Sequence, residues 1–308
     1  MENVIILGDG IAGLAAAIYA ARANLNPVVV TGYESGGQLM WTTDVENYPG
    51  FPEGVLGPDL IDRMRKQAER FGARFVYKRC ERIDGEELAW ECDLGDETLT
   101  ARSIIIATGA TARVLGLEAE KTYMGRGIST CATCDGAFTK GKKVIVVGGG
   151  DSAMEESTFL TKFSDQVTIV HRSDAFRASK IMQERALKNP KISVEWNAEV
   201  VDVFGDGSKV TGAMLRDTLT GAEREVEVDF VFYAIGHIPN TGFLRDRITT
   251  DERFKTIITD ERYMTSAPGI FACGDVQDPI WRQAVTAAGT GAASAISVER
   301  YLAEKEHA

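Results

Sequence analysis

Four residues in the middle of the chain carry a pair of sulfur nucleophiles: Cys131-Ala132-Thr133-Cys134. Two cysteines at this spacing can cycle between a dithiol and a disulfide, because the ring that closes is small and thiolate exchange is fast. The pair lies shortly before a glycine-rich nucleotide-binding pattern. This combination predicts a redox centre that receives its electrons from a dinucleotide.

Two cysteines at this spacing could also be two of the four ligands of a zinc site. Structural zinc takes four ligands, and a second pair of cysteines or histidines usually supplies the other two. The remaining cysteines and the histidines are all isolated in the sequence: Cys80, Cys92, Cys273, His171, His237 and His307. The ligand count therefore predicts no metal. We expect the three other cysteines to be inert, with Cys273 buried in a strand.

Composition limits the class of protein. The chain has 308 residues, of which 44% are hydrophobic and 26% charged, and a formal net charge of −11. That length suits two ordinary domains, and the negative charge argues against binding nucleic acid through a basic surface. No apolar run is long enough to span a membrane, and the N-terminus lacks the features of a signal peptide. We therefore expect a cytoplasmic protein, where a Cys-x-x-Cys pair is catalytic rather than structural.

The first glycine-rich pattern, Gly8-Asp9-Gly10-Ile11-Ala12-Gly13, stands near the N-terminus. It follows an apolar strand over residues 4–7 and precedes a predicted helix from about residue 11 to 23 and a strand over 28–30. This is the context in which G-x-G-x-x-G binds a dinucleotide. Gly8 allows the tight turn, Gly10 lets the backbone approach the pyrophosphate, and Gly13 lets the helix pack closely on the strand.

The pattern recurs in the middle of the chain as Gly148-Gly149-Gly150-Asp151-Ser152-Ala153, after an apolar strand over residues 144–147. The next strand, residues 167–170, leads into His171-Arg172. A residue at this point meets the adenosine ribose, where a carboxylate favours a free 2′-hydroxyl and an arginine favours a 2′-phosphate. Arg172 and Arg177 therefore favour NADP(H) over NAD(H), unless both are ordinary solvated arginines.

The remaining apolar strands predict how the two units interleave. Residues 103–110 and 269–275 form strands that end in glycine turns, and Asp275 could bond a ribityl or phosphate-linked hydroxyl. The first unit would then be completed by C-terminal sequence, with the second inserted into it and closed by a strand over 231–236. We predict an α/β protein with two Rossmann-like, three-layer dinucleotide-binding domains. Residues 1–112 and 241–308 would form one, and residues 113–240 the other, which carries the cysteine pair.

Over essentially its whole length the sequence resembles the low-molecular-weight thioredoxin reductases. The segments that carry the resemblance are residues 36–39, 46–50, 131–136, 171–178, 274–275 and 282–284. The resemblance implies a homodimeric FAD enzyme with the NADPH domain inserted into the FAD domain. Electrons would pass from NADPH through FAD to the cysteine pair and then to the disulfide of thioredoxin.

The resemblance also implies a binding set for each nucleotide. The residues expected to contact FAD are Gly8, Gly10, Ile11, Ala12, Gly13, Thr31, Gly32, Glu34, Gly37, Gln38, Asn47, Ala107, Thr108, Gly109, Gly274, Asp275, Arg282, Gln283 and Ala284. The residues expected to contact NADPH are Gly148, Gly150, Asp151, Ser152, Ala153, His171, Arg172, Arg177 and Ile235.

Three residues receive catalytic roles from the same resemblance. Cys134 would face the flavin, and Cys131 would attack thioredoxin. Asp135 would donate and accept the proton that thiolate and flavin chemistry need nearby. A helix N-cap beside Gly136 is the alternative role for Asp135, and the two roles are compatible.

Three positions depart from the family's pattern. Asp9 places negative charge in the first fingerprint, which is mildly unfavourable beside a pyrophosphate, and we expect its side chain to be exposed. The strand that usually ends in a ribose-binding carboxylate ends in Thr31-Gly32, with Glu34 as the nearest acid. Ser173 replaces a phosphate-binding arginine. Each charge-assisted contact is worth about 1.5–3 kcal/mol, so the preference for NADPH over NADH is expected to be blunted.

One consequence of this layout is mechanical. The cysteine pair and the nicotinamide site fall in the same domain, and both must reach one flavin. The family rotates one domain on two linkers, here residues 113–116 and 236–242, whose glycine and proline content suits hinges as well as ordinary loops.

Two other functions share these motifs. One is a related flavin disulfide reductase with a glutaredoxin-like, peroxidase or other thiol partner. The other is an NADPH-oxidising flavoprotein that reduces oxygen or quinones and uses the cysteine pair as a sensor. Only the second would keep its turnover after loss of Cys134.

Overall fold

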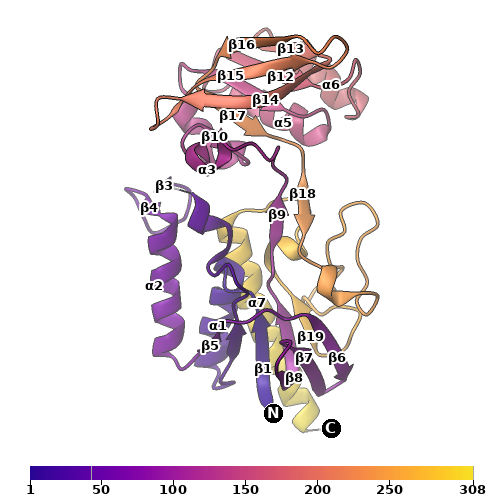
Figure 1. Cartoon of the computed structure of the whole chain (residues 1–308). Helices are drawn as coiled ribbons and strands as arrows, with labels where there is room; N and C mark the ends of the chain where they lie inside the picture. Colours follow the sequence, from indigo (N-terminus) through magenta and orange to yellow (C-terminus); the bar gives the residue numbers. More distant parts are fainter. Residues whose placement is uncertain (43, 308) are drawn as a thin grey trace. The chain divides into compact units, whose positions relative to one another are not determined.

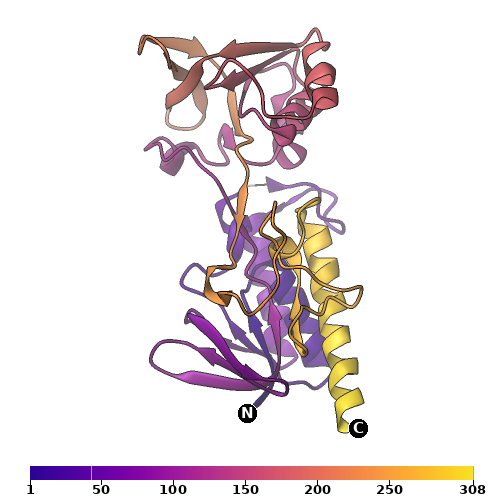
Figure 2. The same cartoon turned by 90° about the vertical axis from the view of Figure 1, so that its right-hand side faces the viewer.

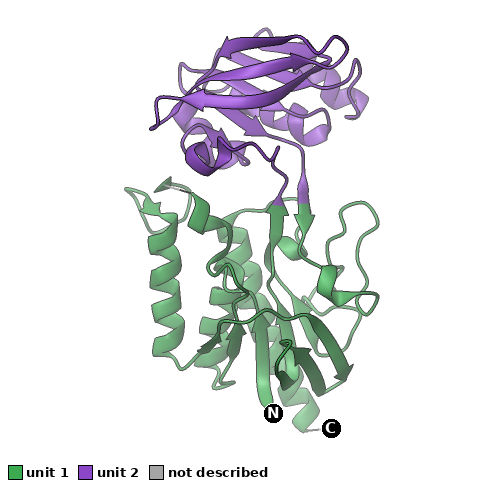
Figure 3. Cartoon of the chain, in the orientation of Figure 1, with its two compact units in different colours: residues 1–111, 238–308 green, residues 112–237 purple. Residues whose placement is uncertain are grey.

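The computed structural model describes residues 1–42 and 44–307, which form two compact units (Figure 3). Unit 1 comprises residues 1–111 and 238–308, and unit 2 comprises residues 112–237. The chain leaves unit 1 once and returns once, so unit 2 is an insertion. Each unit has its own parallel sheet and hydrophobic cores, which agrees with the predicted α/β class.

The sheet of unit 1 has the strand order β5-β2-β1-β8-β7-β6, and β19 pairs with β8 (Figure 1). Its parallel part reads as continuous apolar runs, as expected for strands buried on both faces. Because β19 comes from the C-terminal segment, that segment completes the sheet. The strands are β1 (Glu2–Leu7), β2 (Val28–Val30), β5 (Arg74–Val76), β6 (Arg82–Glu86), β7 (Ala89–Asp93), β8 (Thr98–Ile106) and β19 (Ile270–Ala272).

Helices α1 (Ile11–Arg22), α2 (Gly57–Arg70) and α7 (Ala284–Glu306) complete unit 1. The predicted first helix is confirmed, one residue shorter than expected. Helix α7, the long C-terminal helix in Figure 2, packs closely on α1. A Cβ atom at Gly291 would lie 2.1 Å from the carbonyl oxygen of Ala12, so only glycine allows this approach. The shorter elements are η1 (Gly37–Trp41), β3 (Asp44–Val45), β4 (Val55–Leu56), η3 (Gly242–Leu244) and η4 (Gly274–Val276).

Unit 2 has three layers around a parallel sheet of order β10-β17-β11-β12-β13. Successive side chains of a strand point to opposite faces. Ile145 and Val147 of β11 therefore pack toward the antiparallel sheet β14-β15-β16, while Val144 and Val146 pack toward helices α5 and α6. These elements are β10 (Ile128–Ser129), β11 (Lys143–Val147), α5 (Asp151–Leu160), β12 (Gln166–His171), α6 (Lys180–Leu187), β13 (Ile192–Trp196), β14 (Ala198–Gly205), β15 (Val210–Asp217), β16 (Glu223–Glu227) and β17 (Phe230–Tyr233). Its shorter helices are α3 (Glu120–Tyr123), α4 (Ala132–Asp135) and η2 (Gly136–Thr139).

The two connections between the units run side by side. Strands β9 (Ala110–Ala112) and β18 (His237–Pro239) pair as a two-stranded sheet at the unit boundary. Asn240 joins the two connections, because its amide nitrogen Nδ2 donates to the carbonyl of Thr108 at 2.8 Å and its backbone N–H to that of Gly109 at 3.0 Å.

Candidate functional site

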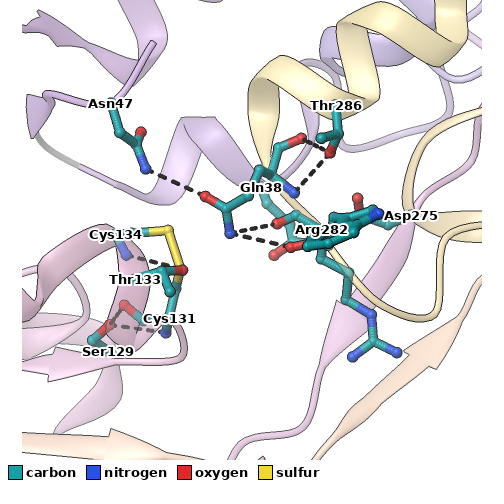
Figure 4. Close-up of a disulfide and its surroundings, with 11 residues drawn as sticks. Gln38, Asn47, Ser129, Cys131, Thr133, Cys134, Asp275, Arg282 and Thr286 are labelled. Atoms are coloured by element: carbon teal, nitrogen blue, oxygen red, sulfur yellow. Dashed lines mark hydrogen bonds between the residues drawn. A yellow bond between two sulfur atoms is a disulfide. The ribbon is translucent and has the colours of Figure 1, made fainter. Parts of the chain in front are cut away.

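The cysteine pair forms a disulfide, with the two Cα atoms 5.3 Å apart (Figure 4). Cys131 occupies the N-cap position of α4, and its sulfur accepts a hydrogen bond from the backbone N–H of Cys134 at 3.2 Å. The hydroxyl of Thr133 lies 3.4 Å from the same sulfur. The predicted disulfide is therefore present, and polar hydrogens gather around one of its two sulfurs.

Ser129 connects this loop to Asp135. Its hydroxyl oxygen accepts from the backbone N–H of Cys131 at 3.1 Å and is also hydrogen-bonded to the Asp135 carboxyl. Burial raises the pKa of Asp135, and the hydrogen bond with Ser129 acts against that rise. Asp135 stands at the N-cap position of η2, but its side chain caps none of the described amides of that helix. Asp135 therefore occupies the N-cap position predicted as its alternative role, but its carboxyl is directed to Ser129 and not to the helix.

A second carboxyl, Glu156 of α5, lies beneath the disulfide loop. It accepts a hydrogen bond from the backbone N–H of Ala132, and burial raises its pKa to about 8. The group is therefore neutral at pH 7. Sequence reasoning missed Glu156, although helical periodicity puts it on the same face as the buried residues Ala153 and Leu160.

The second fingerprint forms an open cradle at the start of α5. Gly150 is the N-cap residue of this helix, and a Cβ atom there would have no neighbour within 4 Å. A Cβ at Gly148 would lie 2.5 Å from the carbonyl oxygen of Ala234, and one at Gly149 would lie 2.2 Å from the ring of His171. Bare backbone at a helix N-terminus with open space before it fits a diphosphate.

The 171–178 segment is tied to this cradle. The backbone N–H groups of Arg177 and Ala178 donate to the carbonyl of Gly149 at 2.8 and 3.1 Å. His171 is buried, and its pKa is lowered by burial and by the positive charges of Arg177 and Arg172. The imidazole is therefore neutral at pH 7, and the two exposed guanidinium groups make the segment cationic.

The other residues of the expected NADPH set lie around the same sheet edge. Asp151 accepts a hydrogen bond from the backbone N–H of Ser179 at 2.7 Å, which fixes the segment to α5. Ser152 is exposed and Ala153 is buried in the first turn of α5. Ile235 is half-buried just beyond the carboxyl end of β17, the edge where ligands of parallel sheets bind.

The first fingerprint makes a similar cradle in unit 1. Gly8 has φ +101°, and a Cβ there would lie 2.5 Å from the carbonyl oxygen of Ala107. A Cβ at Gly13 would lie 1.9 Å from the carbonyl oxygen of Gly8. Gly10, the N-cap residue of α1, is less crowded, because the nearest atom to a Cβ there would be the Cα of Gly37 at 3.9 Å. These residues also fit a diphosphate. Ile11 and Ala12 lie buried behind them.

Asp9 contradicts our prediction of an exposed side chain. It is only 1% exposed, because its carboxylate accepts hydrogen bonds from the backbone N–H of Gly36 at 2.9 Å and the hydroxyl of Ser35 at 2.6 Å, and forms an ion pair with Arg65. A buried carboxylate is stable only when it is paired in this way. Sequence reasoning missed Arg65, since nothing close to Asp9 in the sequence points to it.

Several polar residues of the expected FAD set come together in unit 1 (Figure 4). The side-chain amide of Gln38 donates to the carbonyl of Ala110 at 2.6 Å and approaches the Asp275 carboxyl at 3.5 Å. That of Asn47 donates to Gln283 at 3.3 Å. Burial and the negative charge of Asp278 raise the pKa of Asp275 to about 6, and Arg282 acts against this rise.

The remaining residues of the expected FAD set lie elsewhere in unit 1, outside the polar group around Gln38. Ala107, Thr108 and Gly109 follow β8, Gly274 begins η4, and Ala284 begins α7. Gly37 begins η1, and Gly32 turns the chain after β2. The hydroxyl of Thr31 is buried and donates to the carbonyl of Gly32 at 2.9 Å, so it is directed to backbone. Glu34 is exposed, and the structure does not join it to the polar group around Gln38.

Comparisons with known proteins agree with this arrangement. The family described as pyridine nucleotide-disulphide oxidoreductase matches residues 2–291. A thioredoxin reductase of Mycolicibacterium smegmatis is 51% identical over 306 residues, which cover 99% of this chain and 98% of the relative. One of Rickettsia bellii is 50% identical over 303 residues, 97% of this chain and 98% of the relative. The chain belongs to the thioredoxin reductases.

A solved thioredoxin reductase structure extends this finding to the fold. The protein from Streptococcus pyogenes overlays on the chain with a TM-score of 0.95 at 41% identity, covering 99% of both chains. The resemblance, the two Rossmann-like domains and the enzyme class predicted from sequence are thus confirmed: the chain is an oxidoreductase of the thioredoxin reductase family.

In residues 1–42 and 44–307, no helix is long and apolar enough to cross a membrane. Over the same residues, no cluster of three or more His, Cys, Asp or Glu side chains is placed to hold a metal ion.

Proposed function

We propose that this thioredoxin reductase binds FAD in unit 1 and NADPH in unit 2, and that it uses them to reduce the disulfide of thioredoxin. The observation that carries the proposal is the position of the Cys131–Cys134 disulfide. It lies in the same inserted unit as the Gly148–Ala153 fingerprint, while the other unit has a complete fingerprint of its own. The names of the relatives support thioredoxin as the acceptor.

Each cofactor is assigned to residues that fit it. The N-terminus of α1 at Gly10 would hold the FAD diphosphate, and the group around Gln38 and Asp275 offers partners for polar atoms along the flavin chain. The N-terminus of α5 at Gly150 would hold the NADPH diphosphate, and Arg172 and Arg177 would meet the 2′-phosphate. When bound, NADPH supplies a hydride, and FAD passes the electron pair to a disulfide.

The reduced cysteine pair carries out the exchange with thioredoxin. The Cys131 thiolate attacks one sulfur of the partner disulfide, which forms a mixed disulfide and releases the other partner sulfur as a thiolate. The Cys134 thiolate then attacks the sulfur of Cys131, which re-forms the internal disulfide and releases the second partner thiolate. Two electrons leave the pair and reach the partner. The hydrogen bond from the Cys134 N–H favours negative charge on Cys131, which supports Cys131 as the attacking residue.

Proton transfer is assigned to Asp135. A thiol must lose its proton before it attacks, and a carboxyl whose pKa is raised by burial is better suited to exchange protons with a thiol than an ordinary aspartate. Ser129 holds this carboxyl at the disulfide loop, because its hydroxyl is bonded both to Asp135 and to the N–H of Cys131.

The division of sites between units requires movement. The nicotinamide and the cysteine pair belong to unit 2 and the flavin to unit 1, so unit 2 must adopt two placements in turn. The proposed hinges are the connections through residues 113–116, which follow β9, and 236–242, which contain β18.

A homodimer and a cytoplasmic location complete the proposal. We include a homodimer in the proposal, in line with Ile280 and Trp281, whose side chains are 71% and 67% exposed in the single chain. The reduced, buried thiols of Cys80, Cys92 and Cys273 are consistent with a cytoplasmic protein. Light scattering of the purified protein tests the dimer.

The decisive experiment is an anaerobic titration of the purified protein with NADPH, followed by a panel of acceptors. We expect a yellow protein whose flavin absorbance bleaches with NADPH and which then reduces thioredoxin. Reduction of a glutaredoxin-like protein or a peroxidase in place of thioredoxin would indicate a different thiol partner. NADPH oxidation that continues in air without any thiol acceptor, and after loss of Cys134, would favour an oxidase.

A further inference from the structure

The carboxylate of Asp9 binds the first fingerprint to a separate loop. Asp9 lies between Gly8 and Gly10, where the chain turns from β1 into α1. One of its oxygens accepts from the N–H of Gly36 at 2.9 Å, and the other accepts from the hydroxyl of Ser35 at 2.6 Å. The turn and residues 35–36 are therefore held together by a side chain that is 1% exposed.

Arg65 supplies the opposite charge from α2. Its guanidinium pairs with Asp9, donates to the hydroxyl of Ser35 and donates to the hydroxyl of Tyr77 at 2.9 Å. It also lies over the ring of Phe75, with 4.7 Å from Cζ to the ring centroid. Stacking and several hydrogen bonds fix the guanidinium in one orientation, as a lysine ammonium could not be fixed.

The loop held in this way borders the diphosphate cradle. A Cβ atom at Gly37 would lie 3.3 Å from the Cα of Gly10, and one at Gly10 would lie 3.9 Å from the Cα of Gly37. Gly36 and Gly37 both have positive φ, +94° and +69°, so their backbone is committed to this turn. The position of residues 35–37 therefore sets one wall of the space next to Gly10.

Charge gives the pair a second effect on the same site. A carboxylate in the fingerprint turn would repel a diphosphate bound at the neighbouring Gly10, and burial weakens the screening by water. Arg65 cancels this charge where it arises. An Asp9 carboxylate left without Arg65 would be both unpaired in the interior and repulsive to the ligand.

We propose that Asp9 and Arg65 act together as a positioning pair for the FAD diphosphate: the pair holds residues 35–37 against Gly10 and cancels the negative charge of the fingerprint turn. The inference rests on the proposed FAD site of unit 1. The proposal includes no contact between Arg65 and FAD. The loss of FAD affinity on removing Arg65 should therefore depend on the presence of the Asp9 carboxylate.

A double-mutant cycle tests this dependence. The proteins are the wild type, Asp9→Asn, Arg65→Met and the double variant, each stripped of flavin and titrated with FAD while flavin fluorescence is followed. The asparagine side chain keeps an oxygen for the Gly36 N–H, removes the charge and places an amide NH2 where the other oxygen faces Ser35 and Arg65. Arg63→Met is the matched control, because Arg63 is an exposed arginine of the same helix that stacks on Phe51.

We expect Arg65→Met to raise the FAD dissociation constant about tenfold or more, since partners in one network are strongly coupled. Asp9→Asn and the double variant should each raise it less than Arg65→Met does, because neither contains a carboxylate without a counter-charge. Arg63→Met should stay within about threefold of the wild type. The defect of Arg65→Met should shrink when NaCl is raised from about 0.05 to 0.5 M, which a purely structural defect would not do. Arg65→Lys should fall between the wild type and Arg65→Met.

Other outcomes of this experiment would contradict the proposal. Suppose that removing Arg65 costs the same FAD affinity in the wild-type background and in the Asp9→Asn background. That result would overturn the proposal, because Arg65 would then act on FAD directly. Equal FAD affinity in all variants would also overturn it. If Arg65→Met does not fold, the comparison of Arg65→Lys in both backgrounds decides, and coupling to Asp9 is again expected. A wild-type protein that takes up no FAD would instead refute the proposed function.

Discussion

The backbone N–H of Cys134 points at the sulfur of Cys131, 3.2 Å away, in the first turn of α4. The two sulfurs of the disulfide are therefore not equivalent. After reduction, the hydrogen bond stabilises a thiolate on Cys131, while Cys134 is the more exposed residue of the pair. From the hydrogen bond to its sulfur, we expect Cys131 to be the attacking cysteine and Cys134 the resolving one.

Trapping experiments test the two roles. We expect Cys134→Ser to accumulate a mixed disulfide with a thioredoxin that lacks its resolving cysteine, because Cys131 attacks and nothing in the enzyme releases it. Cys131→Ser should trap none, and both variants should lose thioredoxin turnover while NADPH still bleaches the flavin. Cys273→Ala, which removes a buried free thiol, should keep turnover. Trapping by Cys131→Ser alone would reverse the assignment.

A matched pair of glycine variants tests which unit binds which nucleotide. Gly10→Glu and Gly150→Glu place a carboxylate at the N-terminus of α1 and of α5, at positions with ordinary negative φ and open space. We expect the first protein to purify without FAD, because the added charge repels its diphosphate. The second should keep FAD and lose NADPH-dependent bleaching, while dithionite still bleaches it. Flavin absorbance of the two proteins is the measurement, and the opposite pattern would exchange the two sites.

Donor preference depends on the cationic segment after β12. Arg177→Ala should lower kcat/KM for NADPH about tenfold or more and leave that for NADH nearly unchanged, because a charge-assisted bond to the 2′-phosphate is lost. Ser173→Arg should sharpen the preference. Arg185→Ala, in the last turn of α6, is the control. If Arg177→Ala changes neither donor, this arginine does not bind the phosphate.

The raised pKa of Asp135 predicts a pH-dependent stability. Its neutral form is favoured in the native protein, so the stability that it contributes is complete below the ordinary Asp pKa of about 4 and is lost as pH rises through the raised native pKa. Asp135→Asn should therefore unfold at a higher temperature than the wild type near neutral pH, with no advantage in acid. Calorimetry over a pH series measures this, with Asp174→Asn, an exposed carboxyl, as the control.

The same variant should be impaired in catalysis. Loss of a positioned proton donor typically costs about 10²–10⁴-fold, so Asp135→Asn should lower thioredoxin turnover at least about 10²-fold while NADPH still bleaches the flavin. Unchanged turnover across the pH range would exclude Asp135 as the proton carrier and leave it a structural neighbour of Ser129.

The sequence alone determined the features whose signals are local. The Cys131–Cys134 pair, the two fingerprints and their strands could be read directly, because turn, helix and strand preferences act over a few residues. The insertion of one unit into the other followed from the apolar strands on either side of it. The family's motifs then named two binding sets. Their fingerprint glycines form two cradles in the structure, whereas Glu34 stands apart.

Tertiary structure decided which side chains meet. Asp9 was expected to be exposed, yet it is buried against Arg65, 56 residues away, and Gln38 reaches Asp275, 237 residues away. Glu156 lies under the disulfide loop for the same reason: a helix face shows that a residue is buried, but not what covers it. A charged side chain carries no local signal for its partner. Only the packing of distant segments brings the two charges together in the interior, where a buried charge is stable when it is paired.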